Sequence, residues 1–181
     1  MRAFVGLPVP EPWIAPLVRA QGRILGGRVV PVEDLHLTLA FLDDQPEDRL
    51  EALHDGLEGL ALPSIRLAPL AYVIFGAKRS RLVALDIAPD PALTALRDAV
   101  RGAARRAGIA LPRERFRPHV TLVRFPASAP PDPVRLPRAL EGLGAPDLSV
   151  AMAGAVVLWS SRLTPEGPIY ETLASYPMRA A

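Results

Sequence analysis

Apolar residues recur along the chain with two periods, one typical of β-strands and the other of amphipathic α-helices. Short apolar runs, some of them alternating with polar residues, predict strands that each have at least one face for a core. These strands are expected at residues 2–7, 35–42, 64–75, 81–87, 118–125, 147–160 and 168–177.

Three other segments repeat apolar residues every three or four positions, which predicts helices with one buried face. In the second segment Leu50, Leu53 and Leu57 form this stripe, and polar residues lie between them. Asp90 is expected to cap the third helix, because its carboxylate can accept hydrogen bonds from the first free backbone N–H groups. The helices are expected at residues 11–25, 46–60 and 91–107.

The order of these elements favours an α+β fold over a parallel doubly wound sheet. Residues 76–80 form a glycine-containing connection of hairpin length, so the strands on either side are expected to pair antiparallel. Residues 126–137 are rich in proline and are expected to cross the surface without regular structure. No low-complexity linker divides the chain, so residues 1–181 are expected to form one domain.

The composition narrows both the location and the chemistry. The chain contains no cysteine, which excludes disulfides, thiolate catalysis and cysteine-ligated metals. No apolar run approaches the roughly 20 residues that a membrane span requires, and the N-terminus lacks the apolar stretch of a signal peptide. A soluble, cytoplasmic and monomeric protein is expected, with imidazoles and carboxylates as its candidate catalytic groups.

Arginine supplies nearly all of the positive charge. Lysine and arginine together number 21 against 19 acidic residues, and Lys78 is the single lysine. Arginine favours planar, bidentate contacts with phosphate, but a compositional bias of the genome toward arginine produces the same result. The charge alone therefore leaves a nucleic-acid partner open.

One short pattern occurs twice, each time in a predicted strand. Residues 36–39 read His-Leu-Thr-Leu and residues 119–122 read His-Val-Thr-Leu, so both match His-x-Thr-x. Residues i and i+2 of a strand point to the same face. Each strand therefore presents an imidazole and a hydroxyl on one face and apolar side chains on the other. The chain has three histidines, and two of them occupy equivalent positions, which favours a shared function.

Two such histidines are suited to opening a cyclic phosphate. This hydrolysis needs a base that activates water and an acid that protonates the departing ribose oxygen. An imidazole has an ordinary pKa near 6.5, so one of His36 and His119 can be neutral while the other is protonated; each proton transfer typically contributes about 10²–10⁴-fold. Thr38 and Thr121 would donate hydrogen bonds to the non-bridging oxygens. Neither a metal nor another cofactor is expected.

Other interpretations of these residues stay open. A single strand histidine more often only hydrogen-bonds a backbone carbonyl, and threonine suits strands without any catalytic role. A module that merely grips an RNA end would be served as well by arginine or lysine, which stay charged. A metallohydrolase would need more ligands than the two strands provide. His54 is expected on the solvated face of its helix, away from any site.

The paired motifs resemble those of the two-histidine phosphoesterase superfamily, and specifically the RNA 2',3'-cyclic phosphodiesterases, also called 2'-5' RNA ligases. The resemblance covers nearly the whole chain, including RAFVGL, EDLHLTLAFL, FRPHVTLVR and LWSSRLTPEGPIYETL. It implies a bilobal α+β fold, in which two pseudo-symmetric antiparallel sheets form a cleft and the helices pack outside.

The activity that the resemblance implies is metal-independent hydrolysis of RNA 2',3'-cyclic phosphate ends to 2'-phosphomonoesters. Reversible 2'-5' ligation, or opening of another cyclic nucleotide phosphate, would use the same residues and stays an alternative. The implied site comprises the proton donor His36, the proton acceptor His119, the phosphate-binding residues Thr38, Thr121 and Arg124, and the base-lining residues Phe4 and Tyr170.

The sequence does not fit the implied pattern at two positions, Arg124 and Ala84. Strict alternation from His119 places Arg124 on the opposite face, so its role requires a β-bulge or a side chain that bends over the strand end. Some family members carry tryptophan at the position of Ala84, and Trp159 is the candidate to replace that aromatic ring.

Two further sets of arginines precede the second motif. Arg97, Arg101 and Arg105 recur every four residues on one helix face and are expected to be solvated. A second set alternates along the segment that leads into the motif, where it would either track an RNA backbone or simply be exposed. This second set consists of Arg113, Arg115 and Arg117.

Overall fold

The computed structural model describes residues 1–76 and 81–179, so Lys78 and most of the predicted 76–80 connection lie outside the described residues. The helices are α1 (Glu11–Gln21), α2 (Glu47–Glu58), α3 (Pro91–Arg106) and α4 (Arg135–Leu143), with a 3-10 turn at Val32–Asp34. The strands are β1 (Arg2–Pro8), β2 (Arg28–Val29), β3 (His36–Asp44), β4 (Arg66–Leu67), β5 (Pro69–Phe75), β6 (Leu82–Ile87), β7 (His119–Arg124), β8 (Ala151–Met152), β9 (Ala155–Thr164) and β10 (Gly167–Pro177).

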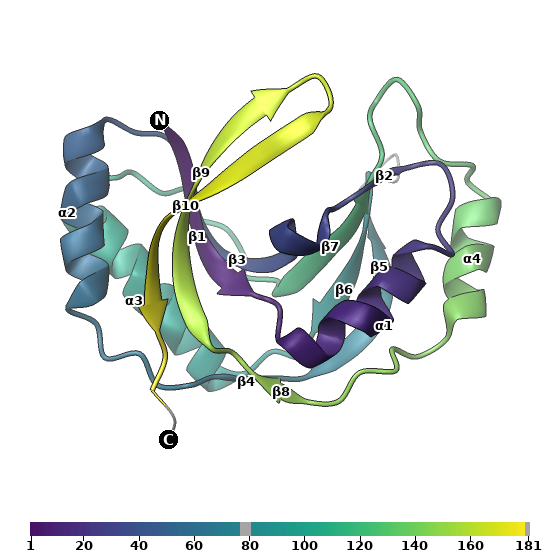
Figure 1. The fold of residues 1–181 in the computed structure, drawn as a ribbon, viewed down its shortest axis with the longest axis horizontal. Helices are drawn as coiled ribbons and strands as arrows, with labels where there is room; N and C mark the ends of the chain where they lie inside the picture. The colour runs from purple at the N-terminus through teal and green to yellow at the C-terminus, as the bar shows by residue number, and fades with distance from the viewer. Residues whose placement is uncertain (77–80, 180–181) are drawn as a thin grey trace.

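The strands pair antiparallel in the order β10-β9-β1-β3-β7-β6-β5, with β2 also on β7, and β4 and β8 form a separate small ladder. β3 and β7 pair through Leu37 and Val120 alone. At this narrow seam the sheet divides into two halves that diverge from each other, and each half contributes one His-x-Thr-x motif (Figure 1). The expected α+β fold with two antiparallel lobes is confirmed.

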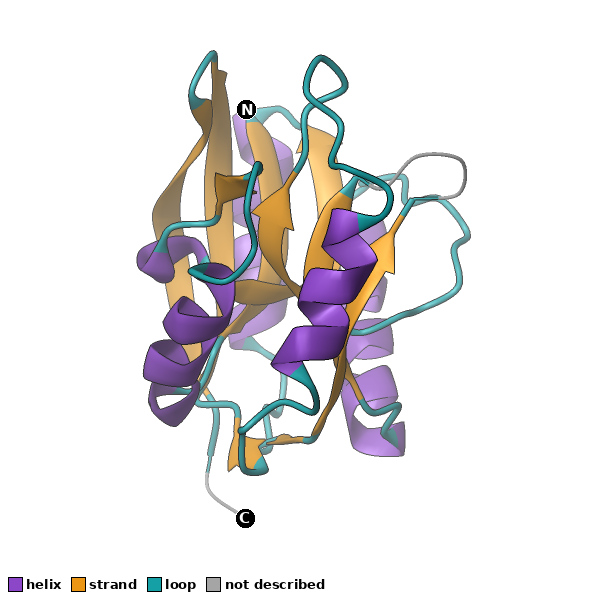
Figure 2. Ribbon diagram, turned by 90° about the vertical axis from the view of Figure 1, so that its right-hand side faces the viewer, coloured by secondary structure: helices purple, strands orange, loops and turns teal. Residues whose placement is uncertain are grey.

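The helices cover the two halves separately. α3 contacts β3 and α2 contacts β10, whereas α1 contacts β7 and α4 contacts β5. In the view turned by 90°, helices lie both in front of and behind the strands (Figure 2). Among the described residues, no helix combines the length and the apolar character that a membrane span would need.

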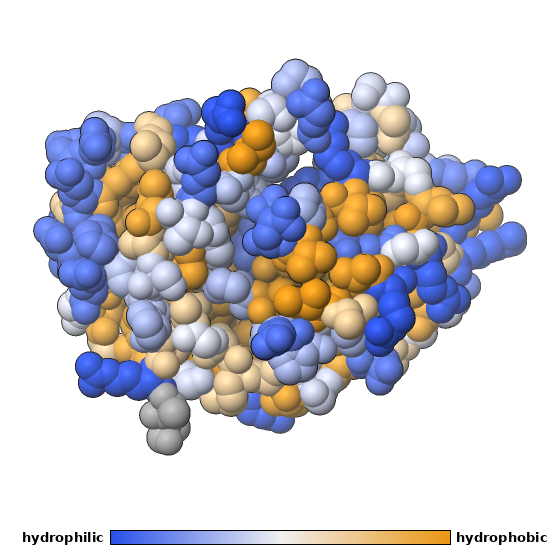
Figure 3. All heavy atoms as spheres, in the orientation of Figure 1, coloured by the Kyte–Doolittle hydropathy of each residue, from blue (hydrophilic) through white to orange (hydrophobic). Residues whose placement is uncertain are grey.

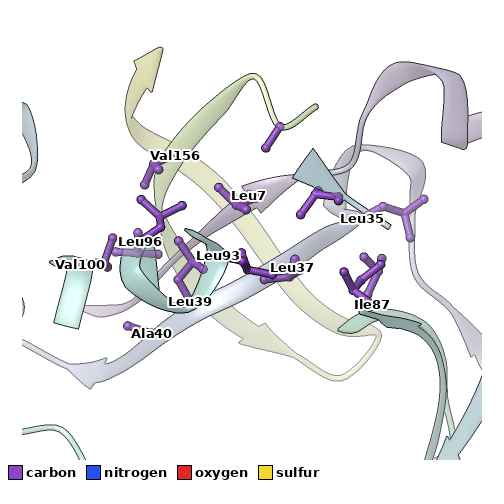
Figure 4. Packing of buried hydrophobic residues seen from close by; sticks show 14 of the residues in the cluster. Leu7, Leu35, Leu37, Leu39, Ala40, Ile87, Leu93, Leu96, Val100 and Val156 are labelled. Carbon is purple, nitrogen blue, oxygen red and sulfur yellow. The ribbon is translucent and has the colours of Figure 1, made fainter. Parts of the chain in front are cut away.

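The core lies on the faces of β3 and β7 that point away from the motif histidines. Leu37 and Val120, at the second motif position, are each 1% exposed. Leu37 and Leu39 pack with Leu93 and Leu96 of α3 and with Leu7 of β1 (Figure 4). Burying one such side chain contributes about 1.5–3 kcal/mol. The apolar positions of the motifs therefore anchor the two strands and leave the polar positions on the opposite face.

Each motif ends in a β-bulge. Val5 pairs with Ala40 and Gly6 pairs with Thr38, so Leu39 is an extra residue on β3. On β7, Leu122 is extra in the same way, because Val83 pairs with Val123 and Ala84 with Thr121. The fourth motif position is thus the bulged residue in both halves, and the face that each following side chain points to is reversed there.

Gly6 allows β1 to approach the first bulge. A Cβ atom at this position would lie 2.5 Å from the Leu37 carbonyl oxygen, which is backbone and cannot rotate away. We therefore expect Gly6→Ala to lower the free energy of unfolding by about 1–3 kcal/mol, as overpacking does, when measured by urea denaturation. Gly56→Ala, within α2, is the matched control, because a Cβ atom there meets only Ala103 of α3 at 3.5 Å, an ordinary contact. It should raise stability by about 0.5–1 kcal/mol; equal effects of both changes would contradict the explanation.

Several predicted segments differ from the structure. The prediction that residues 126–137 form an irregular connection is wrong in its last part, because α4 begins at Arg135. Asp132 accepts hydrogen bonds from the backbone N–H groups of Val134 and Arg135, and a proline is tolerated in a first helical turn. The strand predicted at 147–160 is interrupted between Met152 and Ala155, which separates β8 from β9. The strand predicted at 64–75 is likewise divided at Ala68 into β4 and β5, which belong to different sheets. The helix predicted at 11–25 ends at Gln21.

Candidate active site

The four polar motif residues gather at the seam between the two halves. Because Leu37 lies opposite Val120 in an antiparallel register, His36 neighbours Thr121 across the seam and Thr38 neighbours His119. All four side chains are partly exposed, while the residues that alternate with them are buried. The structure therefore brings together the two imidazoles and two hydroxyls that the sequence predicted would act at one site.

Both imidazoles are held in the same way. The Nδ1–H of His36 donates to the carbonyl of Asp34 at 2.6 Å, and the Nδ1–H of His119 donates to the carbonyl of Arg117 at 2.7 Å. The acceptor is two residues earlier in each case. Since Nδ1 carries the proton in these bonds, the neutral ring has its lone pair on Nε2. Each histidine is thus prepared to accept a proton at Nε2, or to donate one from Nε2 when it is protonated.

Different aromatic rings surround the two histidines. The ring centroid of His36 lies 4.7 Å from that of Phe4 and 5.6 Å from that of Tyr170. Phe4 is only 2% exposed and packs against His36, although it is among the residues that line a neighbouring surface pocket. On the other half, the centroid of Phe75 lies 4.7 Å from that of His119. The roles of Phe4 and Tyr170 beside a nucleobase stay predictions.

Arg124 lies on the site face because of the bulge at Leu122. Simple alternation from His119 would put Arg124 on the opposite face, and the bulge turns it back to the face of the motif residues. Arg124 lines the same pocket as His36 and Thr121. The buried Gln21 stabilises this bulge, because its Nε2 donates to the carbonyl of Leu122 at 2.9 Å. Sequence reasoning missed Gln21, which is one polar residue at the end of a helix with no motif around it.

The pKa values of both histidines are depressed in the ligand-free protein. Burial lowers the pKa of His36 to about 4, and the nearby positive charges of Arg124 and His119 act in the same direction against the hydrogen bond to Asp34. Burial also lowers the pKa of His119, assisted by Arg124. Both imidazoles are therefore mainly neutral at pH 7 in the ligand-free protein.

A surface pocket opens beside His36. Its walls come from β2 and the segment after it, from β7, and from the tip of the β9–β10 hairpin, including Tyr170 and Arg124. Figure 3 shows an opening in the surface below this hairpin tip. His119 and Thr38 are not among the lining residues of this pocket, although they lie on the same two strands as Thr121 and His36.

The part of the chain that the structure describes contains no cluster of three or more His, Cys, Asp or Glu side chains that could hold a metal ion. The acidic residue nearest to the motifs in the strand register is Asp86, which pairs with His119 and forms an ion pair with Arg117 at 3.6 Å. Metal independence stays a prediction that a chelator can test.

Comparison with known proteins identifies the family. The model of the 2'-5' RNA ligase superfamily matches residues 8–163. The chain belongs to the 2'-5' RNA ligase superfamily. It is 32% identical to the RNA 2',3'-cyclic phosphodiesterase of Thermus thermophilus over 99% of this chain and 91% of that protein.

Solved structures agree with this membership in the 2'-5' RNA ligase superfamily. The crystal structure of TT0787 of Thermus thermophilus superimposes with a TM-score of 0.80, at 26% identity and 99% coverage of both chains. The apo form of E. coli LigT superimposes with a TM-score of 0.78, at 24% identity, over 98% of this chain and 96% of that one. The second likeness concerns the fold alone.

Ala84 is the position where the resemblance to the 2'-5' RNA ligase superfamily implied a tryptophan in some members. This residue is fully buried and pairs with Thr121, so it offers no surface to a substrate. Trp159 does not replace a ring at this place, because it packs beside His36 in the other half, with ring centroids 5.4 Å apart. Phe75 is the aromatic residue next to His119.

The prediction that Arg97 and Arg101 are solvated is wrong. They are 7% and 4% exposed, and both approach the Glu114 carboxylate at 3.5 Å. Arg97 also lies over the ring of Phe116, 4.7 Å from its centroid. The regular spacing of these charged residues indicated a solvent-exposed helix face, but the loop that leads to His119 covers that face. These two arginines therefore hold that loop against α3.

The arginines of the second set differ in their contacts. Arg113 and Arg115 are exposed, and Arg117 lies over the Phe75 ring, 4.1 Å from its centroid. His54 is less exposed than expected, because its Nδ1 shares a hydrogen bond of 2.8 Å with the hydroxyl of Tyr176. It lies on α2, which contacts β10, and is absent from the lining of the active-site pocket.

Proposed function

We propose that the protein hydrolyses RNA 2',3'-cyclic phosphate ends to 2'-phosphomonoesters without a metal ion. The observation that carries this proposal is the pair of equivalent histidines at the seam, each with Nδ1 bound to a backbone carbonyl and Nε2 left for chemistry. The name of the Thermus thermophilus relative, RNA 2',3'-cyclic phosphodiesterase, supports the same substrate.

His119 acts as the base in this proposal. Its Nε2 accepts a proton from a water molecule, and the oxygen of that water attacks phosphorus. Its pKa lies below the ordinary value, so the ring is neutral at cellular pH. The His119 side chain is itself partly exposed, which leaves it accessible to water.

His36 acts as the acid and protonates the departing 3' oxygen, so that phosphate stays on the 2' oxygen. Its depressed pKa means that the imidazolium form releases its proton readily. The proton must be taken up when the substrate binds, because the phosphodiester anion offsets Arg124 and raises the pKa of His36. The aromatic rings around His36 hold it in place during this exchange.

Arg124, Thr38 and Thr121 hold the phosphate. Arg124 lies close enough to both histidines to lower their pKa values, which supports a role for its charge beside the non-bridging oxygens. The two hydroxyls flank the same seam and donate hydrogen bonds to those oxygens. Donors already aimed at developing negative charge are often the largest catalytic contribution.

The product tests the proposal. Nucleoside 2',3'-cyclic phosphates incubated with the protein should yield the 2'-phosphate, separated from the 3'-phosphate by chromatography or ³¹P NMR. The rate should be the same with EDTA as without it. A 3'-phosphate product would show that the 2' oxygen, and not the 3' oxygen, is the leaving group. An absolute need for a divalent ion would refute the metal-independent mechanism.

Ligation is the second candidate, because the matching family model carries the description 2'-5' RNA ligase superfamily. The same base and acid would act in the same sense, with a 5'-hydroxyl taking the place of water as the nucleophile and the 3' oxygen departing with a proton. Hydrolysis is favoured in dilute aqueous solution. An RNA with a 2',3'-cyclic end, supplied together with an excess of a 5'-hydroxyl RNA, separates the two outcomes by product length.

A further inference from the structure

Positive charge extends beyond the active-site pocket along the ends of three strands. Arg124 at the end of β7 pairs with Arg28 on β2, and on its other side it pairs with Leu82, the residue after Arg81. The three arginines line one surface pocket together with Leu82, Phe125 and Pro126. We name it the arginine pocket. Paired residues on neighbouring strands share a face, so Arg28 and Arg124 point to the same side.

This arrangement costs stability unless an anion occupies it. Like charges directly opposite each other on neighbouring strands are destabilising. Arg28 donates to the carbonyl of Pro165 at 3.1 Å, which satisfies one N–H group but cancels no charge. Within residues 1–76 and 81–179, no ion pair joins any of the three to a carboxylate, whereas Arg97, Arg101 and Arg117 all have one.

The arginine pocket adjoins the active-site pocket. Arg28 and Arg124 line both pockets, and the second pocket also contains His36 and Thr121. An anion at the histidines and a second anion in the arginine pocket would therefore share Arg124. In an RNA with a cyclic phosphate at its 3' end, the nearest second anion is the phosphodiester on the 5' side of the terminal nucleotide.

We propose that the arginine pocket binds this adjacent backbone phosphate and thereby makes the protein selective for oligonucleotide ends over mononucleotides. The inference rests on the proposed function of the two histidines. Arg81 and Arg28 supply charge that the reacting phosphate does not need, and Leu82, Phe125 and Pro126 offer an apolar wall for the ribose. Arginine matches phosphate geometry through its planar fork of N–H donors.

The test compares three substrates over a series of salt concentrations. They are a nucleoside 2',3'-cyclic phosphate, the same nucleoside with an additional 5'-phosphate monoester, and a trinucleotide with a 2',3'-cyclic end. The trinucleotide should have the highest kcat/KM and the steepest fall with salt. Arg81→Gln should lower kcat/KM for the trinucleotide several-fold more than for the nucleoside. It should also reduce the slope of log kcat/KM against log salt by about 0.7, as the loss of one single-strand phosphate contact does.

Arg106→Gln is the matched control, because it removes the same charge from an exposed arginine at the end of α3 that lines neither pocket. It should leave the selectivity and the salt slope as they are. Equal losses on all three substrates after Arg81→Gln, or no preference for the trinucleotide, would overturn the inference. A full gain from the 5'-monoester alone would assign the pocket to terminal phosphates and overturn the backbone version.

Failure of the proposed function gives a different result. In that case none of the three substrates is hydrolysed, and the role of the arginine pocket is tested by measuring the binding of RNA instead. A fluorescent trinucleotide with a 3'-phosphate should then bind the unaltered protein more tightly than Arg81→Gln, as measured by anisotropy. Equal affinities would overturn the inference independently of catalysis.

Discussion

Replacing either His36 or His119 by alanine should abolish measurable hydrolysis of a nucleoside 2',3'-cyclic phosphate. Each variant loses one proton transfer, which is typically worth about 10²–10⁴-fold, and the two losses should not add, because either missing group stops the same step. The measurement is kcat at saturating substrate, with a thermal melt of each variant to show that it is folded.

His54→Ala is the control for these variants. The structure gives His54 a hydrogen bond to Tyr176, so this change should lower the melting temperature slightly while kcat stays close to that of the unaltered protein. A loss of activity comparable to that of the motif variants would mean that histidine replacement acts through folding.

A substrate with sulfur in place of the bridging 3' oxygen distinguishes the acid from the base. A thiolate departs without needing a proton, so this substrate should partly rescue His36→Ala and should not rescue His119→Ala. The opposite pattern would show that the two histidines have exchanged roles.

Arg124→Gln should lower kcat/KM by about 10²–10³-fold, the usual loss when one donor to a developing oxyanion is removed. It should also raise the pKa values of His36 and His119, because the positive charge of Arg124 depresses both. A purely structural role for Arg124 would lower activity without moving these titrations, which can be followed by NMR of the imidazole protons.

The sign of the pH dependence follows from the same charge. Hydrolysis needs protonated His36, whose pKa in the free protein is about 4, and neutral His119, whose pKa is also lowered, so kcat/KM should follow a bell-shaped curve that falls above the higher of the two pKa values. The bound phosphate raises the pKa of His36, and the optimum of kcat should therefore lie at higher pH than the optimum of kcat/KM. In Arg124→Gln the kcat/KM optimum should move upward, whereas Arg106→Gln should leave it in place.

The strands that carry the motifs, and the side of each strand that carries the chemistry, could be predicted from the sequence alone. Strand periodicity depends on local geometry alone, so the alternation of His36 and Thr38 with Leu37 and Leu39 sufficed to separate a polar face from a core face. The same local information placed α2 by its leucine stripe and α3 by its Asp90 cap, whose carboxylate accepts from Ala92 and Leu93 as expected.

Only the tertiary structure decided where Arg124 points and what surrounds it. A bulge is a mismatch between two paired strands, so the extra residue at Leu122 becomes visible only when β6 lies beside β7. The pairing of Arg124 with Arg28 likewise joins segments far apart in the chain. The burial of Arg97 and Arg101 under Glu114 reversed a prediction made from spacing. Local periodicity reports the shape of an element, but charge and burial depend on which distant residues pack against it.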